Sequence, residues 1–433
     1  METAHSGVVR RFATRYAIVY FGLYALASPM VSYLLTWPDF SSVGEHPWSQ
    51  LVSWVGAHVF RLEGVIAVKG SGDRVFDWVQ VVTFAAMSGA VAVVWTLLGC
   101  RARATDGGVN RSRDADRRLE AWLRTGLRFA LGAVLAYYGA IKVFPVQAAP
   151  LSLMRLLQPV GGLSPEQLMW TWLAASPLYQ ALVGIAEVAA AVLLFVPWTA
   201  SAGALIALVE LLHIFALDVG FQVPVRLFVF HLVIMAVVLA APDVPRLFRA
   251  WRGCAAVPPR PIPPPLFARR SFHHVAIAAQ LLVGAYVTGV HLYGAHDAWR
   301  SQQAAESAPL YGIWIVETMA EDGVVRPPLI TDDQRWQRIV IESGFAFLQR
   351  MDDTFVPHRA SVDAGGHVVT LTREADPAWA ATLTIGRPTP ERLILQGQMD
   401  GREVRLDLRL VPRSGFPLVT DALHFVQEPP ARN

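Results

Sequence analysis

Seven apolar segments constrain this chain of 433 residues more than any other feature of its sequence. They fall near 14–35, 76–99, 124–145, 178–197, 199–218, 225–241 and 273–293. A hydrocarbon core about 30 Å thick needs about 20 mostly apolar helical residues to cross it. The sequence therefore predicts seven transmembrane helices. The first apolar run is too long for the core of a signal peptide and is expected to stay as an anchor.

Composition supports a membrane protein and argues against two other classes. Apolar residues make up 54% of the chain and charged residues only 16%, far from the balance of a soluble domain. The net charge of +3 is what the basic cytoplasmic loops of a membrane protein require, so no nucleic-acid partner is inferred. Cys100 and Cys254 are the only thiols and form no CxxC pair, which argues against thiol redox chemistry.

The distribution of arginine predicts which side of the membrane each loop occupies. All but two of the 37 basic residues are arginine, as in a chain from a GC-rich bacterial genome. They gather before the first apolar segment, between the second and third, and between the sixth and seventh. Because basic loops stay in the cytoplasm, we expect a bacterial inner-membrane protein. Its N-terminus is then cytoplasmic and its C-terminal domain periplasmic or extracellular.

Beyond about residue 305 the apolar pattern changes from helical to alternating. Runs such as YGIWIVE, HVVTLT and EVRLDLRL alternate apolar with polar residues, as half-buried strands do. Turn signals separate the runs, among them Asp363-Ala364-Gly365-Gly366 and Asp400-Gly401. About eight or nine consecutive strands predict a meander closed into a small barrel. Such a barrel either fills its interior with side chains or keeps a cavity for an apolar ligand.

The predicted fold class is an α-helical integral membrane bundle followed by an all-β, barrel-like extracytoplasmic domain. Residues 1–245 hold six helices, 246–272 form a cytoplasmic linker, 273–294 form the seventh helix, and 305–433 form the β-domain. Six prolines between 256 and 267 predict that part of the linker is stiff and extended.

Two further helices are predicted in the loops on the outer side. Residues 48–63 place their apolar side chains near one helical face, as a helix lying in the membrane interface does. A second helix is expected to begin at Ser164, because Ser164-Pro165-Glu166-Gln167 has the pattern of a capping box with proline at the first helical position.

Four ionisable residues in or beside the apolar segments are the candidates for catalysis. A charge at bilayer depth is costly unless it is paired or hydrated, so each such residue is a functional candidate. Glu187 and Glu210 are expected near the midplane, and His213 follows Glu210 on the same helical face. Lys142 is expected near the outer end of the third helix.

Other polar residues are candidates for holding a ligand. His231 is expected at about the depth of His213, and Asp218 and Arg226 complete a polar pocket that opens outward. The run from Lys69 to Arg74, KGSGDR, contains glycines that allow successive backbone N–H groups to cradle an anion. Lys69 and Asp73 are therefore further candidates, although such a run is also an ordinary turn.

The sequence leaves three readings of the intramembrane cluster open. In a structural network, Glu187 or Glu210 is neutral or paired with Arg226 or Lys142. In a quinone site, a carboxylate or histidine exchanges protons with the hydroxyl groups of a quinol in an apolar pocket. Metal or haem binding has less support, because Glu210-x-x-His213 is only one half of the doubled di-iron motif. No metal is predicted.

Five short motifs together resemble a group of bacterial DoxX-like membrane proteins. They are GSGDRVFDW at 70–78, YYGAIKVFPVQ at 137–147, SPEQLMWTW at 164–172, GIAEVAAAVLLF at 184–195 and QVPVRL at 222–227. The likeness covers about residues 10–245. It implies a DoxX-type helical bundle, and the namesake relatives of that fold belong to a thiosulfate:quinone oxidoreductase.

The resemblance transfers to only a few positions. Lys142, Gln147, Glu187 and Arg226 match places where the group has Lys, Gln, Glu and Lys. The chain departs from the group at Gln222, where aspartate is usual, and at His213 and Asp218, where asparagines are expected. Gly312-Ile313-Trp314, at the start of the first strand, is similar to the Gly-x-Trp start of lipocalin-like barrels.

Two functions of different classes follow from these patterns. One is a quinone-linked oxidoreductase component whose bundle binds a quinone. The other is a non-catalytic envelope protein that binds lipid or scaffolds partner proteins through its β-domain. The sequence does not decide whether there is a reaction.

Overall fold

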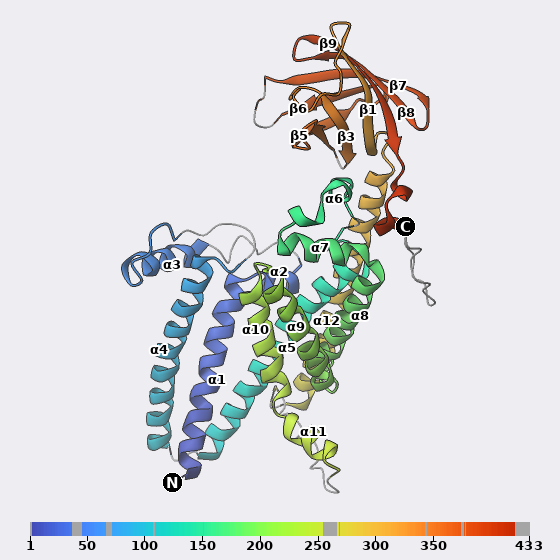
Figure 1. Cartoon of the computed structure of the whole chain (residues 1–433). Coiled ribbons are helices and arrows are strands. Elements are labelled where there is room, and N and C mark those ends of the chain that lie inside the picture. Colours follow the sequence, from blue (N-terminus) through green and yellow to red (C-terminus); the bar gives the residue numbers. More distant parts are fainter. Residues whose placement is uncertain are drawn as a thin grey trace. The chain divides into compact units, whose positions relative to one another are not determined.

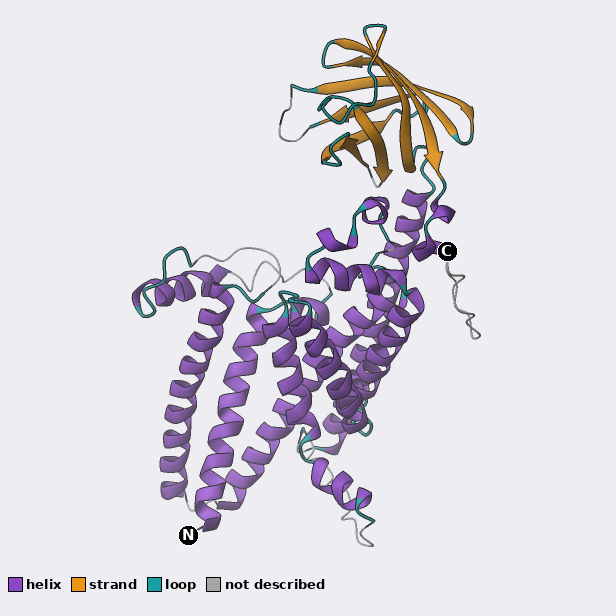
Figure 2. Cartoon of the chain, viewed as in Figure 1, coloured by secondary structure: helices purple, strands orange, loops and turns teal. Residues whose placement is uncertain are grey.

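The computed structural model describes residues 2–36, 46–65, 72–106, 109–149, 151–253, 266–267, 269–342, 344–373, 376 and 378–420. The chain separates into two compact units. The first comprises Met1–Gln147 and Leu178–His296, and the second comprises Ala148–Pro177 and Asp297–Asn433. The first unit is helical, whereas the second carries all the strands of the described chain (Figure 1) (Figure 2).

The helices of the first unit follow the apolar periodicity of the sequence. They are α1 (Glu2–Ala27), α2 (Met30–Leu34), α3 (His46–His58), α4 (Val75–Asp106), α5 (Val109–Val143), α8 (Pro177–Phe195), α9 (Ala200–Gly220), α10 (Arg226–Ala240), α11 (Val244–Trp251) and α12 (Arg270–Glu306). Every apolar segment predicted to be helical contains a helix, but the helix predicted over 48–63 is α3, which ends at His58.

Five of these helices are long and apolar enough to cross a membrane, judged by length and composition over the described residues. They are Val75–Arg101, Asp114–Val143, Pro177–Phe195, Ala200–Gly220 and Arg270–Glu306. A sixth crossing results if α10 and α11, which are bent by 68° to one another, count as one broken span. The predicted number of seven is therefore not matched. Alone, α10 has only 15 residues, and α1 carries Arg10 and Arg11 in its N-terminal half and Arg15 at its middle.

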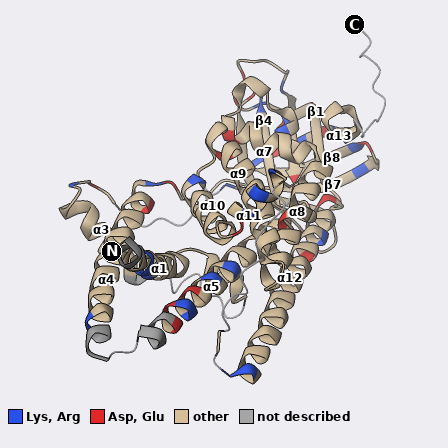
Figure 3. Cartoon of the chain, turned by 90° about the horizontal axis from the view of Figure 1, so that it is seen from below, with Lys and Arg blue, Asp and Glu red and all other residues tan. Residues whose placement is uncertain are grey.

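The charged residues are unevenly distributed among these helices. No Asp, Glu, Lys or Arg occurs from Ser271 to His296 in α12, whereas acidic and basic residues alternate in the N-terminal part of α5 (Figure 3). A long segment without charge cannot be hydrated well, so it must be covered by apolar partners or lipid.

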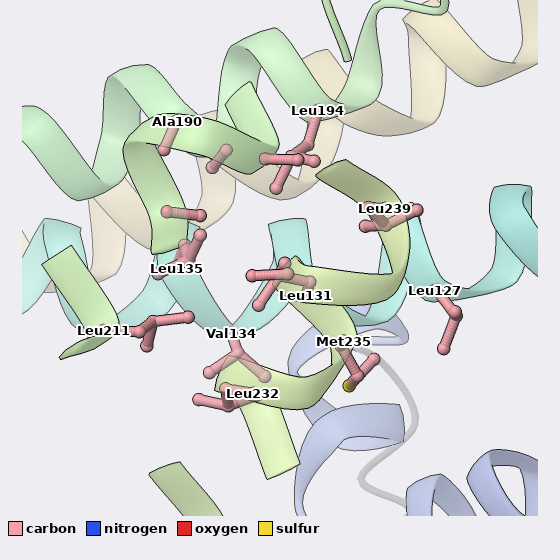
Figure 4. Packing of buried hydrophobic residues seen from close by; sticks show 14 of the residues in the cluster. Leu127, Leu131, Val134, Leu135, Ala190, Leu194, Leu211, Leu232, Met235 and Leu239 are labelled. Atoms are coloured by element: carbon pink, nitrogen blue, oxygen red, sulfur yellow. The ribbon is translucent and has the colours of Figure 1, made fainter. Parts of the chain in front are cut away.

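The core of the first unit lies among α5, α8, α9 and α10. Leu131, Val134 and Leu135 of α5 point toward Leu194 of α8 and Leu232 of α10 (Figure 4). Dense packing of this kind holds helices at fixed separations, because interiors tolerate few voids.

The second unit is an eight-stranded antiparallel barrel with a short extra strand. Its strands are β1 (Gly312–Glu321), β2 (Val324–Val325), β3 (Trp336–Glu342), β4 (Phe345–Arg350), β5 (Phe355–Val362), β6 (Val368–Thr372), β7 (Ala380–Thr389), β8 (Arg392–Met399) and β9 (Arg402–Val411). Each long strand pairs with the next, and β1 pairs with β9 to close the barrel. The predicted meander and its closure are confirmed.

Side chains occupy the barrel interior. Trp314, Trp336 and Trp379 are buried in one cluster with Met319, Met399 and fifteen further residues. The turn Asp400-Gly401 has positive φ angles of 49° and 78°, the backbone of the tight hairpin that the sequence predicted. Interior packing by large side chains favours the self-filled barrel over one with a ligand cavity.

A segment from the middle of the chain completes the second unit. It contains α6 (Leu153–Leu157), a short 3₁₀ turn η1 (Val160–Gly162) and α7 (Pro165–Ala175). Leu153 of α6 is buried against Ile313 and Val340, which face the outside of the barrel. The C-terminal turn η2 (Arg413–Gly415) and α13 (Pro417–Thr420) also belong here. The compact unit therefore extends beyond the boundary at 305 expected from the sequence.

Two predicted details of the loops can be compared with the structure. The capping box at the start of α7 is confirmed: Ser164 accepts from the N–H of Gln167, and Gln167 accepts from the N–H of Ser164. The first part of the expected linker is helical in α11, whereas most of its proline-rich part, 254–265 and 268, lies outside the described residues.

Candidate functional site

Lys142 and Glu187 form a buried ion pair between α5 and α8. The ammonium Nζ lies 2.7 Å from Oε1 and 2.6 Å from Oε2, so it bridges both carboxylate oxygens. Both side chains are almost inaccessible to solvent. Of the pairings that the sequence left open for Glu187, the structure therefore has the one with Lys142. Burying a charge costs the least free energy when the charge is paired with an opposite one, as it is here.

Two glycines allow α5 and α8 to come close enough for this pair. A Cβ on Gly184 would lie 2.6 Å from the carbonyl oxygen of Gly139, and one on Gly139 would lie 2.8 Å from the side chain of Val188. Only residues without a side chain let two helix backbones approach so closely. Gly184 lies three residues before Glu187, so the crossing and the ion pair share one face of α8.

An aromatic group from α2, α5 and α12 adjoins Lys142 through the ring of Tyr138. The ring of Tyr138 is 5.7 Å from Nζ of Lys142, a cation–π contact, and its hydroxyl is 3.5 Å from that of Tyr33. Tyr33 stacks on Tyr137, and Nε2 of His291 lies 2.8 Å from the carbonyl oxygen of Tyr33. The sequence analysis missed Tyr138, although its position four residues before Lys142 puts both on one helical face.

Asp218 of α9 is the buried carboxyl whose hydrogen bonding is incomplete. Asp218 is only 5% exposed, and its Oδ2 has no hydrogen-bond partner in the described part of the chain. Lys142, Asp73 and Arg226 act on it electrostatically. A buried polar atom left without a protein partner is a position where a water, ion or ligand is expected.

Asp73 and Arg226 form a cap rather than an open anion site. One oxygen of Asp73 accepts from the backbone N–H of Leu227 at 2.7 Å, and the other accepts from the backbone N–H and Nε of Arg226 at 2.9 Å. These contacts satisfy the free N–H groups at the start of α10. Both oxygens of Asp73 are therefore occupied within the protein, and Asp73 does not contribute to the predicted anion site. Lys69 lies outside the described residues.

Both ring nitrogens of His231 are occupied within the protein. Nδ1 lies 2.6 Å from the carbonyl oxygen of Leu227, and Nε2 lies 2.6 Å from the hydroxyl of Tyr20. Since a carbonyl only accepts, Nδ1 donates, and Tyr20 donates to Nε2. The ring also stacks on Tyr24 with a centroid separation of 3.9 Å. His231 therefore has no lone pair left to ligate a haem iron.

His213 and Glu210 lie on a more open face of α9. The Tyr179 hydroxyl lies 2.7 Å from Nε2 of His213, and Glu210 acts on His213 electrostatically from one turn away. His213 is exposed, and it is set among exposed apolar residues of α8 and α9 that include Leu182 and Val209, which is 70% exposed. A hydrogen-bonded polar group on an apolar surface suits an amphiphilic ligand that approaches from lipid.

The structure divides the predicted candidates into two groups. One group has two ion pairs, the buried Lys142–Glu187 and the partly exposed Asp73–Arg226, with Asp218 near enough for both to act on it electrostatically. In the other, Glu210 and His213 lie with Tyr179, a residue that the sequence did not single out. Among the described residues, no three His, Cys, Asp or Glu side chains are grouped so that they could hold a metal ion.

Comparison with known proteins finds no match to this chain. No family model matches the chain, and neither a curated protein nor a solved structure matches it.

Proposed function

We propose that the helical unit is a DoxX-like membrane bundle that binds a quinone, or a lipid with a similar polar head, at Tyr179, His213 and Glu210. The observation that carries this proposal is the Tyr179–His213 hydrogen bond on an exposed apolar face, with Glu210 one helical turn away. The motifs shared with DoxX-like proteins support the same reading.

The three side chains suit the two ends of a quinone–quinol pair. When the Tyr179 hydroxyl donates to Nε2 of His213, Nδ1 carries the ring proton. Nδ1 makes no hydrogen bond within the described chain, so it is available to donate to a quinone carbonyl oxygen. The Glu210 carboxylate likewise has no hydrogen bond to a described residue and can accept from a quinol hydroxyl. Ligand oxygens would thus replace solvent or lipid rather than existing protein contacts.

We also propose where the chain lies in the cell. We place the chain in a bacterial inner membrane, with α1, α4, α5, α8, α9, α10 and α12 as the seven crossings. The N-terminus is then cytoplasmic and the barrel extracytoplasmic. The arginines in the N-terminal half of α1, at the C-terminal end of α4 and in the N-terminal part of α5 support this orientation by the positive-inside rule.

Mass spectrometry of an organic extract from the detergent-purified protein tests the proposal. A quinone enriched over the membrane pool is expected, and His213→Ala or Glu210→Gln should lower the quinone per protein by about tenfold, the effect of losing one hydrogen bond to a ligand in an apolar environment. Val209→Ala is the matched control, because Val209 is on the same helix and exposed but apolar. A quinone content that is equal in all four proteins would reject the site.

A non-catalytic envelope protein is the second candidate. The closed Lys142–Glu187 pair, the occupied nitrogens of His231 and the filled barrel interior favour it, because each group already has its partners within the protein. In this case the extract contains only ordinary phospholipid, and protein partners bind through the barrel surface.

A further inference from the structure

Helix α11 presents a continuous apolar face that no described residue covers. Val244, Leu247, Phe248 and Trp251 are between 47% and 81% exposed. Their spacing of three, four and seven residues places all four on one side of the helix. Soluble surfaces seldom expose four large apolar side chains in two turns, so this face is expected to be covered in the working protein.

Arginines border and oppose the apolar face. Arg252 lies over the ring of Phe248 at 4.3 Å, which places its cation at the edge of the apolar side. Arg249 points away from that side by helical position and makes no ion pair with a described residue. Arg246 pairs with Asp243 at 2.9 Å. Residues 243–253 therefore carry a net charge of +2, from three arginines and one aspartate.

Asp243 fixes the direction of α11. One carboxylate oxygen accepts from the hydroxyl of Ser201 on α9, and the other accepts from Arg246 on α11. Asp243 is itself buried. The turn that bends α11 by 68° from α10 is thus anchored to the neighbouring helix α9. A short helix turned sharply at the end of an apolar one has the geometry of a helix that lies along a membrane surface.

We propose that α11 is an interfacial helix that binds anionic phospholipid. Val244, Leu247, Phe248 and Trp251 insert among the acyl chains, while Arg249 and Arg252 contact phosphate groups. The combination of an apolar face and arginine suits this partner, since lipid supplies both an apolar layer and negative charge. A second copy of the chain suits it less, because the face is small and would bring two positive helices together. The inference rests on the membrane location proposed above but not on quinone binding.

Fluorescence quenching on the full-length protein in nanodiscs tests the inference. In a Cys100→Ala, Cys254→Ala background, Leu247→Cys is labelled with bimane, and lipids carrying a nitroxide near the headgroup are the quenchers. Quenching at Leu247→Cys should exceed that at Ala250→Cys by about threefold, because Ala250 is exposed on the same helix but lies about 110° from the centre of the apolar face, beyond its edge. Equal quenching at the two positions would overturn the proposal.

The charge requirement is tested with two lipid mixtures. Replacing part of the phosphatidylcholine by phosphatidylglycerol should raise quenching at Leu247→Cys, and Arg249→Gln with Arg252→Gln should abolish that rise. A rise that survives the double substitution contradicts a role for the arginines. Disulfide formation between two Leu247→Cys chains at high yield would show that another copy covers the face, and would also overturn the proposal.

A label on α12 separates failure of this inference from failure of the membrane location. Leu282 is 71% exposed in a helix of spanning length. Because Leu282 lies near the middle of the uncharged run of α12, lipids with a nitroxide near the end of the acyl chain are the quenchers for Leu282→Cys. If Leu282→Cys is quenched by these lipids and Leu247→Cys is not quenched by the headgroup nitroxide, α11 is not interfacial but the membrane location stands. If neither is quenched, both fail.

Discussion

At the scale of single residues, the Lys142–Glu187 pair shows what the sequence could not provide. Its members are 45 positions apart, and each was a separate candidate for chemistry. Nothing local in the sequence selects Glu187 over Glu210 as the partner of Lys142. The choice depends on the close crossing of α5 and α8 at Gly139 and Gly184, which is a property of packing.

Removing one member of this pair is expected to destabilise the helical unit strongly. Glu187→Gln leaves the ammonium buried without a counter-charge, and the free energy of unfolding should fall by about 3–5 kcal/mol. The double variant Lys142→Met, Glu187→Leu should recover most of the loss, because no charge remains buried. Thermal unfolding in detergent measures both. If the double variant is as unstable as Glu187→Gln, unpaired charge is not the cause.

His358 is expected to make the barrel sensitive to acid. It is buried against Trp379, and burial lowers the pKa of its ring from the ordinary 6.5 to about 4, with Arg373 nearby contributing to the same shift. As the pH falls below about 6.5, the unfolded chain binds the proton first. The stability present above that pH should therefore decline by on the order of 2 kcal/mol down to pH 4, where the loss levels off.

Calorimetric unfolding of the full-length protein across this pH range measures the effect. His358→Phe should remove much of the decline in the barrel transition. His367→Gln is the matched control, because His367 is an exposed histidine in the same unit, and it should leave the decline unchanged. A decline of equal size in all three proteins would point to other groups.

At the scale of helices and strands, sequence patterns were most successful where the signal is local. Apolar length and period predicted each long helix, and alternation with Asp-Gly turns predicted the meander, since both depend on neighbours in sequence. The bend between α10 and α11 was not predicted. It depends on Asp243, whose partner Ser201 lies 42 residues away on α9.

The helix crossing at Gly184 is expected to tolerate no side chain. In Gly184→Ala the new Cβ would lie 2.6 Å from backbone atoms of Gly139 and Val143, so α8 must move away from α5. A loss of about 1–3 kcal/mol in unfolding free energy is expected. Gly126→Ala on α5 is the control, because its Cβ would meet nothing within 4 Å. Gain of stability in both variants would indicate that helix propensity outweighs the crossing.

The packing of α6 on the barrel predicts a distant effect of a single substitution. Leu153 is 2% exposed and packs on Ile313 and Val340, so Leu153→Ala should destabilise the second unit by about 2–4 kcal/mol through the cavity it leaves. Hydrogen exchange in β1 and β3 of the full-length protein should rise accordingly. Leu168→Ala, at a more exposed position of α7, should change it little. Unchanged exchange in Leu153→Ala would mean that the barrel is stable without α6.

At the scale of the whole molecule, the second unit limits how the chain can cross a membrane. It is built from Ala148–Pro177 and Asp297–Asn433, so these two pieces must lie on the same side. Between them run α8, α9, the α10–α11 pair and α12. An even number of crossings is required, and three of these helices have spanning length by themselves. The α10 segment must therefore supply the fourth crossing if the other three all span, and α11 then follows it along the membrane surface.

Helix α1 decides on which side of the membrane the N-terminus lies. With α4 and α5 crossing, the residues just before α4 lie on the same side as the barrel, and the N-terminus is on the opposite side only if α1 also spans. We expect that it does, because Arg10, Arg11 and Arg15 favour the cytoplasm at its N-terminal end. Alkaline phosphatase fused at the C-terminus should be active, and a fluorescent protein fused at the N-terminus of the same chain should fluoresce. An active phosphatase with a dark N-terminal fusion would place α1 outside the bilayer and leave six crossings. An inactive phosphatase would place the barrel in the cytoplasm and contradict the orientation inferred from the arginines.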